Sequence, residues 1–347
     1  MNTNSFEWAI IGAGPAGIAA IGKLLDSNIA PEKILWIDPY FNVGDLGRYW
    51  KNVSSNTTVK LFLDFLKAVK SFAFDKAHHD FALTHLAQDE TCTLNYIVEP
   101  LQWITDHFRE KIANSQDFIK KLNRTNGQWR IQGASNYQAK QIILATGAEP
   151  KQLHHSDIET ISFKDAINKN NLSKIVNQNE TYAVFGSSHS AIMIIHHLME
   201  LNVHQVINFY RSPCRYAIDM GDWILFDNTG LKGKTAEWAK TNIDGIQPDN
   251  LKRYITNENN IIHYLPLCNK AIYAIGFEKR RTISIDDYEQ PSYHSRLGII
   301  APGLFGLGIG YPAIKSDPFG NIEEQVGLWK FVIYLDKIMP LWLKYRI

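Results

Sequence analysis

The opening of the chain constrains the fold more than any other segment. An apolar run, residues 6–11, leads directly into a glycine-rich turn of the form G-x-G-x-x-G, made of Gly12, Ala13, Gly14, Pro15, Ala16 and Gly17. A strand, such a turn and a helix, in this order, predict a Rossmann-like unit that binds a dinucleotide. The first glycine permits the tight turn, the second lets a pyrophosphate approach the backbone, and the third lets the helix pack on the strand.

An acidic residue stands where this pattern needs one. A second apolar run, residues 34–37, ends at Asp38, about 20 residues after the turn. An acid at this distance accepts hydrogen bonds from an adenosine ribose. We therefore predict that Asp38 holds the ribose, while the helix N-terminus faces the pyrophosphate and the turn contacts it through Gly12, Gly14, Pro15, Ala16 and Gly17. The alternative role of Asp38 is to cap a turn or a helix.

A second unit of the same form begins about 170 residues later. The apolar run 182–185 precedes a turn, a helical stretch at 192–201 and another apolar run at 206–210. The turn consists of Gly186, Ser187, Ser188, His189, Ser190 and Ala191. Ser188 takes the place of the central glycine, so its side chain either crowds a pyrophosphate or donates a hydrogen bond to it. We predict that these six residues bind a second dinucleotide.

Three side chains in or after the second turn bear on which nucleotide it binds. Arg211 lies about 20 residues after the turn, where an acid favours NADH and an arginine suits the additional phosphate of NADPH. Arg215 could join it, and the alternative for Arg211 is a solvated surface arginine. His189 begins the helix, and because a helix N-terminus lowers the pKa of histidine, we expect a neutral ring. A histidine used only for packing is the alternative.

Composition excludes several function classes. A hydrophobic content of 45%, a charged content of 20% and a net charge of +1 are ordinary for a soluble globular protein and indicate no nucleic-acid partner. No apolar run reaches the ~18 residues of a membrane span, and residues 1–20 do not resemble a signal peptide, so we expect a cytoplasmic protein. The aromatic-rich residues 328–347 predict a docked amphipathic helix, with contact to a membrane surface as the alternative.

Cysteine and histidine spacing predicts neither a redox pair nor a metal site. Cys92, Cys214 and Cys268 stand far apart, and the chain has no C-x-x-C motif. The pairs His78-His79 and His196-His197 are adjacent residues, which do not share a helix face.

Other segments give a coarse secondary structure. Asn126-Gly127 predicts a hairpin between 121–125 and 128–131, and 141–145 predicts a strand. Long stretches without Gly or Pro predict mostly helix over 58–120. Residues 212–260 have no clear period and are expected to be irregular.

Two dinucleotide units in one chain resemble the FAD- and NAD(P)H-dependent two-domain flavoproteins, the superfamily of the pyridine nucleotide-disulfide oxidoreductases. The shared motifs, in order, are the first turn, Ala145-Thr146-Gly147, the second turn, Ala274-Ile275-Gly276-Phe277 and residues 304–308 before a final helix. The resemblance implies an α/β fold with two Rossmann-like domains. An NAD(P)H domain, residues 151–279, is inserted into a discontinuous FAD domain, residues 1–150 and 280–347.

The loop after Asp38 is most similar to the flavin-containing monooxygenase branch. Residues 44–50 resemble a G-G-x-W-like loop, and Ser55-Asn56-Thr57 resembles a segment whose Asn lies beside the reactive edge of the flavin. The resemblance implies that Asn56 is catalytic; an Asx turn or a helix cap is the alternative. It also implies that FAD contacts Trp50, Thr146, Gly147, Gly308 and Gln325.

Three functions remain open. The first is an NADPH-dependent monooxygenase that uses dioxygen on a small substrate with a nitrogen, sulfur or carbonyl centre. The second is an NAD(P)H-dependent flavin reductase of a quinone or protein acceptor, which is favoured by Ser188 and by a monooxygenase fingerprint reduced to His154-His155-Ser156. The third is a flavin-binding interaction protein without turnover. A homodimer, the commonest soluble oligomer, is compatible with each.

Overall fold

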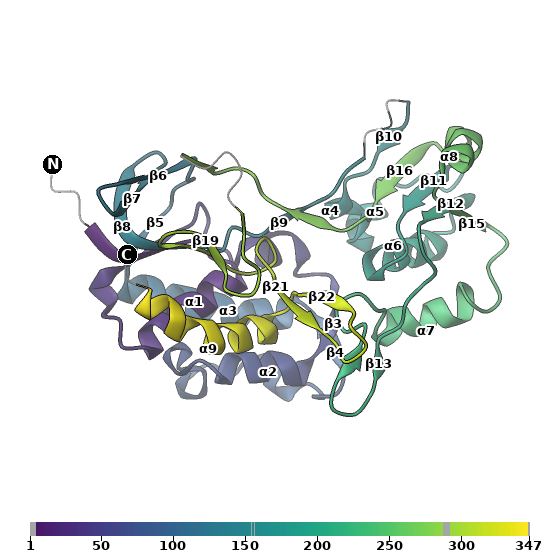
Figure 1. Cartoon of the computed structure of the whole chain (residues 1–347). Helices are drawn as coiled ribbons and strands as arrows, with labels where there is room; N and C mark the ends of the chain where they lie inside the picture. Colours follow the sequence, from purple (N-terminus) through teal and green to yellow (C-terminus); the bar gives the residue numbers. More distant parts are fainter. Residues whose placement is uncertain (1–4, 154, 156, 287–291, 346–347) are drawn as a thin grey trace. The chain divides into compact units, whose positions relative to one another are not determined.

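A computed structural model describes residues 5–153, 155, 157–286 and 292–345 of the chain. It divides into two compact units, and the purple start and yellow end of the chain in Figure 1 belong to the same unit. Unit 1 comprises Met1–Ala148, Lys279–Ser316 and Glu324–Ile347, and unit 2 comprises Glu149–Glu278 and Asp317–Glu323. The segment 317–323, which the sequence placed in the first domain, therefore groups with unit 2.

Parallel strands form the centre of unit 1. β1 (Ser5–Ile11) lies between β2 (Ile34–Ile37) and β8 (Asn136–Leu144) and runs parallel to both. β5 (Ala113–Ser115) extends the sheet beyond β2, and β20 (Leu304–Gly306) runs parallel to the end of β8. The carboxyl ends of these strands meet at one edge of the sheet, where such folds bind their ligands.

An antiparallel extension completes the sheet of unit 1. β6 (Lys121–Thr125) and β7 (Gln128–Gln132) form the predicted hairpin, whose turn residues Asn126 and Gly127 both have positive φ. β7 pairs with β8, while β18 (Ser284–Ile285) joins β6 and β19 (Ile299–Ala301) joins β20. The sequence prediction of this hairpin is confirmed.

Four helices of unit 1 cover one face of this sheet (Figure 1). They are α1 (Pro15–Asp26), α2 (Val59–Lys67), α3 (Asn95–Lys111) and α9 (Leu328–Lys344). The apolar core between them includes Trp8, Trp36, Phe108 and Trp342. α9 is fixed to α1 by an ion pair of 2.7 Å between Lys23 and Asp336. The predicted docked helix at 328–347 is therefore confirmed over 328–344.

The prediction of mostly helix over 58–120 holds for α2 and α3 but not for the segment between them. Short 3-10 turns occupy Lys70–Phe72, Phe74–Lys76 and Ala82–His85, and β3 (Ser54–Thr58) pairs with β4 (Thr91–Thr93). The aromatic residues here pack into the core from irregular backbone, as Phe72, Phe74 and Phe81 show. Burial of these rings, rather than helical periodicity, fixes the segment.

Unit 2 contains a parallel sheet in the order β10-β16-β11-β12-β15. Its strands are β10 (Glu159–Thr160), β16 (Lys270–Tyr273), β11 (Thr181–Phe185), β12 (Gln205–Tyr210) and β15 (Leu251–Ile255). The helices of this unit are α4 (Phe163–Ala166), α5 (Lys169–Leu172), α6 (His189–Glu200), α7 (Gly233–Asn242) and α8 (Glu258–Tyr264). Both units therefore show the predicted α/β fold.

The expectation of irregular structure over 212–260 is wrong for much of the segment. It holds the short pair β13 (Ile218–Asp219) and β14 (Ile224–Leu225), all of α7, the strand β15 and the start of α8. β15 was missed because Lys252 and Arg253 interrupt its apolar pattern. Tertiary pairing with β12 makes it a strand.

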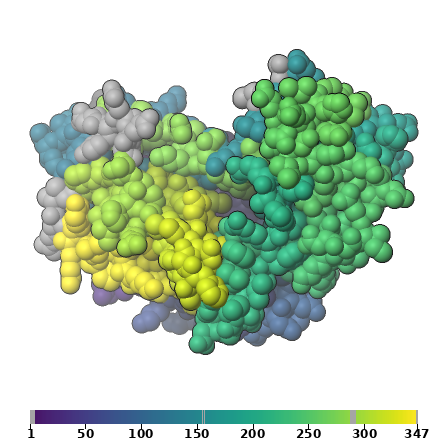
Figure 2. Space-filling view, turned by 45° about the vertical axis from the view of Figure 1, so that its right-hand side comes forward, coloured from purple at the N-terminus to yellow at the C-terminus, as the bar shows by residue number. Residues whose placement is uncertain are grey.

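The remaining strands form two short ribbons. β9 (Ala148–Pro150) pairs with β17 (Phe277–Lys279), and β21 (Ala313–Ser316) pairs with β22 (Ile322–Gln325). Residues in the yellow range of the colour bar, which include α9, reach the surface in Figure 2.

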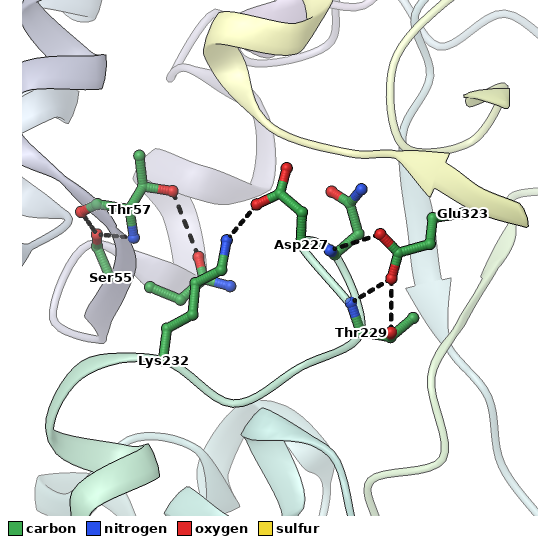
Figure 3. A network of polar contacts seen from close by, with 8 residues as sticks. Ser55, Thr57, Asp227, Thr229, Lys232 and Glu323 are labelled. Atoms are coloured by element: carbon green, nitrogen blue, oxygen red, sulfur yellow. Dashed lines mark hydrogen bonds and ion pairs between the residues drawn. The ribbon is translucent and has the colours of Figure 1, made fainter. Parts of the chain in front are cut away.

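Glu323 shows why 317–323 groups with unit 2. Its carboxylate accepts hydrogen bonds from Thr229 Oγ1 at 2.6 Å and from the N–H groups of Asn228 and Thr229 at 3.2 Å (Figure 3).

Candidate functional site

The first glycine-rich turn joins β1 to α1. Gly12 has φ of +114° and donates its N–H to Ile37 O at 2.8 Å. A Cβ on Gly12 would lie 2.3 Å from Ala145 O, and one on Gly17 would lie 2.0 Å from Gly12 O. Both residues must therefore be glycine for the helix to begin so close to the strand.

Gly14 is a glycine for a different reason. It is the N-cap of α1 with φ of −78°, a conformation open to any residue, and its nearest neighbour would be Gly44 Cα at 3.9 Å from a Cβ. No contact with the described chain therefore demands a glycine here. The absence of a side chain at a helix N-terminus that begins with Pro15 fits a bound pyrophosphate, which needs close approach to the backbone.

Asp38 holds the first turn from the side of β2. Its carboxylate is buried and accepts three backbone hydrogen bonds of 2.8 Å, from Ala13 to Oδ2 and from Tyr40 and Phe41 to Oδ1. The alternative reading of Asp38 as a turn cap is thus seen in the structure. Since Oδ2 accepts one bond from Ala13, it retains capacity for a ribose hydroxyl, which stays a prediction.

Several predicted FAD residues gather at this edge of unit 1. Thr146 and Gly147 follow β8, and Gly308 follows β20. A Cβ on Gly308 would lie 2.7 Å from Ala16 Cβ, and one on Gly310 would lie 2.3 Å from Gly147 O. The structure therefore brings Thr146, Gly147 and Gly308 to the first turn from segments far apart in the sequence.

Trp50 and Gln325 lie on other segments of unit 1. Trp50 ends a π-helical turn, Leu46–Trp50, and its ring meets Tyr49 edge-on at 6.1 Å. Asp45, directly before this turn, forms an ion pair with Arg280. Gln325 ends β22 and is half-buried. Contacts of these two residues with FAD stay predictions.

The second turn repeats the first turn's backbone. Gly186 has φ of +126° and donates its N–H to Phe209 O at 2.8 Å. Ser188 is the N-cap of α6 with φ of −92°, and its exposed hydroxyl makes no capping hydrogen bond. Ser187 and Ser190 are half-buried beside it, and Ala191 packs fully buried. Ser188 is therefore unstrained, and its hydroxyl remains available to a ligand.

His189 is largely buried at the start of α6. Burial, with Lys232 nearby, lowers its pKa to about 4, so the ring is neutral at physiological pH. The expected neutrality agrees with this direction, although burial and Lys232 are the causes rather than the helix end that the sequence suggested. Lys232 forms an ion pair of 2.5 Å with Asp227 (Figure 3). Neither ring nitrogen has a hydrogen-bond partner among the described residues.

Arg211 follows β12 and is exposed. Arg215, four residues later, lies over the Phe226 ring at 5.2 Å. The carboxyl end of the second strand is where a residue that selects between NADH and NADPH is expected. The alternative of a solvated arginine has the same exposure, so the role of Arg211 stays a prediction.

Sequence reasoning missed two residues, on β12 and β15, that support the second turn. Asn208 on β12 donates hydrogen bonds from Nδ2 to Val184 O at 2.9 Å and to Gly186 O at 2.8 Å. Its Oδ1 accepts from Arg253 Nε on β15 at 2.9 Å. A single polar residue inside the apolar run 206–210 was the available signal. Arg253 gave none, because β15 was not predicted.

Asn56 lies exposed on β3. Its neighbour Ser55 makes the local turn, since Thr57 N donates to Ser55 Oγ at 2.8 Å (Figure 3). Thr58, not Asn56, is the N-cap of α2. The one hydrogen bond that the described residues give Asn56 is from Thr57 Oγ1 to its Oδ1 at 3.4 Å. The alternative reading of Asn56 as a helix cap is therefore wrong, and its amide NH₂ is left for a ligand.

The histidines noted between the two domains are only partly described. His154 and Ser156 lie outside the described residues. His155 Nδ1 is 2.7 Å from Tyr273 Oη, and its ring stacks on Phe185 at 5.4 Å. His155 therefore packs onto the carboxyl ends of β11 and β16.

Two glycine-rich turns on parallel sheets point to a family, and sequence comparison decides it. Residues 6–224 match the family model described as pyridine nucleotide-disulphide oxidoreductase. Monooxygenase AgnR1 from Paecilomyces divaricatus is 30% identical over 96% of this chain and 97% of its own length. The chain belongs to the pyridine nucleotide-disulphide oxidoreductases.

Solved structures share the fold of this oxidoreductase. A flavin-containing monooxygenase from Stenotrophomonas maltophilia has a TM-score of 0.66 at 12% identity, with 99% of each chain covered. A thioredoxin reductase from Lactococcus lactis has a TM-score of 0.59 at 12% identity, with 98% of each chain covered. At such identity the likeness concerns the fold. Family and fold together make the chain an enzyme, a two-domain flavoprotein oxidoreductase that uses FAD and a nicotinamide cofactor.

The cysteines of this oxidoreductase lack the character of a redox pair. A catalytic dithiol needs a thiol whose pKa is lowered. Cys92, Cys214 and Cys268 are all free thiols, and burial raises the pKa of Cys92 and, to about 12, that of Cys268. Burial also raises the pKa of Cys214, although Arg253 opposes this rise. Thiol-disulfide chemistry by these residues is therefore disfavoured.

The described residues offer neither a metal site nor a membrane-spanning helix. Within them, no group of three or more His, Cys, Asp and Glu side chains could hold a metal ion. No helix there has the length and apolar character to cross a membrane.

Proposed function

We propose that this oxidoreductase is an NADPH-dependent flavin monooxygenase that uses dioxygen on a small substrate with a nitrogen, sulfur or carbonyl centre. The observation that carries the proposal is the exposed Asn56 amide, which takes no part in capping α2. A neutral amide can hydrogen-bond an oxygen and a substrate heteroatom together. The monooxygenase relative, similar over nearly its whole length, supports the same reading.

The residues of each unit have separate roles in this proposal. In unit 1 the first turn, Asp38, Thr146, Gly147, Gly308, Trp50 and Gln325 would hold FAD. In unit 2 the second turn and Arg211 would hold NADPH, with Arg211 on the additional phosphate. Bound FAD would accept a hydride from the nucleotide and, once reduced, activate dioxygen. Asn56 would orient the substrate by hydrogen bonding. A cytoplasmic location, which we propose as well, agrees with three free thiols.

Anaerobic mixing tests the nucleotide half of the proposal. FAD-loaded protein is mixed with NADPH and, separately, with NADH, and the flavin absorbance is followed. Rapid bleaching with NADPH and slower bleaching with NADH are expected. Bleaching by neither nucleotide would contradict the proposal and favour a flavin-binding protein without turnover.

Asn56→Ala tests the oxygenation half. The variant should retain FAD and its reduction by NADPH, but divert consumed NADPH into hydrogen peroxide instead of product. Asn52→Ala, an exposed asparagine on the same segment, is the matched control and should keep wild-type coupling. Equal coupling in the Asn56 variant would remove this residue from the site.

A flavin reductase is the second candidate, favoured by Ser188 in place of a central glycine. It would pass electrons to a quinone or protein acceptor without inserting oxygen. Rapid mixing of the reduced protein with dioxygen separates the two functions. A long-lived absorbance change before reoxidation supports the monooxygenase, and direct reoxidation supports the reductase.

A further inference from the structure

Asn208 is a polar residue on the buried strand β12 of unit 2. It is 0% exposed, and its neighbours on β12, Val206, Ile207 and Phe209, are buried apolar residues. A buried amide is unfavourable unless its donors and acceptor are satisfied. Asn208 meets this condition through both Nδ2 donors and through Oδ1, which accepts from Arg253 Nε at 2.9 Å.

Unit 1 contains an equivalent hydrogen bond to its glycine-rich turn, donated by a different side chain. Trp36 faces Ile10 in the register of β2 with β1, and Asn208 faces Val184 in the register of β12 with β11. Trp36 Nε1 donates to Gly12 O at 3.0 Å, as Asn208 Nδ2 donates to Gly186 O at 2.8 Å. In both units a buried donor on the second strand therefore holds the carbonyl of the first glycine in the turn.

Holding this carbonyl fixes a second group. Because the peptide bond is planar, fixing Gly186 O also fixes the N–H of Ser187. In unit 1 the equivalent N–H, that of Ala13, is taken by Asp38 Oδ2 at 2.8 Å. In unit 2 the residue at the place of Asp38 is Tyr210, which has no carboxylate. Among the described hydrogen bonds none uses the Ser187 N–H, so this donor is left for a ligand.

Arg253 adds a charge that unit 1 does not have at this position. Its guanidinium bonds Asn208 and lies over the Tyr210 ring, with Cζ 4.4 Å from the ring centroid. A charged donor to Oδ1 polarises the Asn208 amide, and this strengthens the hydrogen bonds that Asn208 Nδ2 donates to Gly186 O and Val184 O. Arg253 lies opposite Asn208 in the register of β15 with β12, and Asn208 precedes Arg211 by three residues.

We propose that Asn208 and Arg253 are positioning residues, which hold the second turn so that the Ser187 N–H is presented to a phosphate of the nicotinamide nucleotide. This inference rests on the proposed binding of that nucleotide by unit 2. It also explains how the turn could bind a nucleotide with Ser188 in place of glycine. The hydrogen bond from Asn208 to Gly186 O fixes the turn, so the turn does not depend on a glycine at its centre.

The test uses NADPH as the probe and FAD-loaded full-length protein. Arg253→Met and Asn208→Leu should each weaken NADPH binding about tenfold, measured by titration and by the dependence of anaerobic flavin reduction on NADPH concentration. The limiting rate of reduction should change little, because the residues position the nucleotide without touching the reacting atoms. FAD content should stay at the wild-type level.

The double variant Asn208→Leu/Arg253→Met separates positioning from simple stability. Replacing both partners by apolar side chains leaves neither the amide nor the guanidinium buried without the other, although the carbonyls of Val184 and Gly186 still lose their donor. The melting temperature should therefore recover part of the way towards the wild-type value. NADPH affinity should stay low. If affinity recovers together with stability, the positioning role is wrong. Lys252→Met, an exposed cation on the same strand, is the control for loss of charge and should bind NADPH as wild type does.

Failure of this inference is distinguishable from failure of the proposed function. If wild-type protein binds NADPH but forms no oxygenated product, the monooxygenase proposal fails and the positioning role stands on the binding data. If wild-type protein binds neither NADPH nor NADH, both fail. If all variants bind NADPH as tightly as wild type, only the positioning role fails.

Discussion

The two glycine-rich turns are nearly the same in backbone and very different in side chains. Gly12 and Gly186 have φ of +114° and +126°, and each donates its N–H to the second strand at 2.8 Å. The N-cap residues Gly14 and Ser188 are both extended. The backbone of such a turn therefore requires its first glycine, whereas the central position is open to serine.

The differences lie in what surrounds the backbone. In the first turn, the carboxylate of Asp38 accepts a hydrogen bond from the second residue of the turn, Ala13. In unit 2 the position that corresponds to Asp38 is Tyr210, whose ring contacts the guanidinium of Arg253. Unit 1 uses a neutral indole as the buried donor, and unit 2 uses an amide bonded to Arg253. The same turn backbone thus has an indole and a carboxylate beside it in unit 1 and a guanidinium beside it in unit 2. This contrast agrees with the different nucleotides that we propose for them.

Substitutions at the third glycine position of the two turns should differ most in their cost to the free energy of unfolding. In Gly17→Ala the new Cβ would lie 2.0 Å from Gly12 O, so α1 must shift, and we expect a loss of about 3 kcal/mol in the free energy of unfolding together with loss of FAD. The reciprocal Ala191→Gly should cost only about 1 kcal/mol, the helix propensity of glycine. Urea unfolding and FAD content measure both. Equal effects in the two units would contradict the comparison.

Asp38→Ala should have the next largest effect. It leaves the N–H groups of Ala13, Tyr40 and Phe41 without their acceptor, at a cost of about 2 kcal/mol in the free energy of unfolding, and weakens FAD binding. Tyr210→Phe at the equivalent place in unit 2 should be close to neutral for stability. Retention of FAD in Asp38→Ala would reduce this residue to a dispensable cap.

Acid should weaken unit 2 through its buried histidines. Burial lowers the pKa of His189 and of His197 to about 4, with Lys232 adding to the effect on His189 and Glu200 opposing it on His197. An unfolded histidine titrates near pH 6.5, so between about pH 6.5 and 4 the unfolded chain binds protons that the folded chain does not. Stability is therefore complete above this window and falls by about 1 kcal/mol per histidine at pH 5.5.

Amide hydrogen exchange at pH 7 and pH 5.5 checks this prediction, with corrections for the intrinsic exchange rates. Protection should fall more in α6, which begins with His189, than in α1, which begins with Pro15. His189→Leu should flatten the dependence, and substitution of the exposed His204 by Gln should not. Equal losses of protection in the two helices would contradict it.

The central position of each turn should give the smallest effect. Because Ser188 is unstrained and its hydroxyl is exposed, Ser188→Gly should change NADPH affinity only a few-fold, less than 1 kcal/mol. Gly14→Ser should weaken FAD binding by more, since a pyrophosphate at this helix N-terminus needs close approach to the backbone and a side chain would obstruct it. A large loss of NADPH binding in Ser188→Gly would instead identify the hydroxyl as a ligand.

Much of the fold could be predicted because its signals are local. The turn sequence, apolar runs of four or more residues and Asn126-Gly127 each specify their own backbone, so β1, α1 and the β6–β7 hairpin were found. β15 was not found, because Lys252 and Arg253 hide its period and its pairing with β12 is non-local. The segment between α2 and α3 failed for a similar reason: buried aromatic rings hold irregular backbone there.

The candidate site could be predicted only in part. Residues of the turns follow from their own motif, but Gly308 reaches Ala16 only through the pairing of β20 with β8. The resemblance to a known family, not a local pattern, supplied Gly308 and Asn56. The three bonds of Asp38 and the Asn208–Arg253 pair depend on neighbours that no sequence window contains.

The discontinuous make-up of unit 1 sets an order for its folding on the ribosome. β1 and α1 are synthesised first, yet β20 and α9 complete their sheet and cover their core from the far end of the chain. The larger part of unit 2, residues 149–278, is continuous and can fold while unit 1 waits. The nascent chain therefore leaves the side of α1 that packs on α9 uncovered until α9 emerges, which makes this interval the one in which a chaperone would matter most.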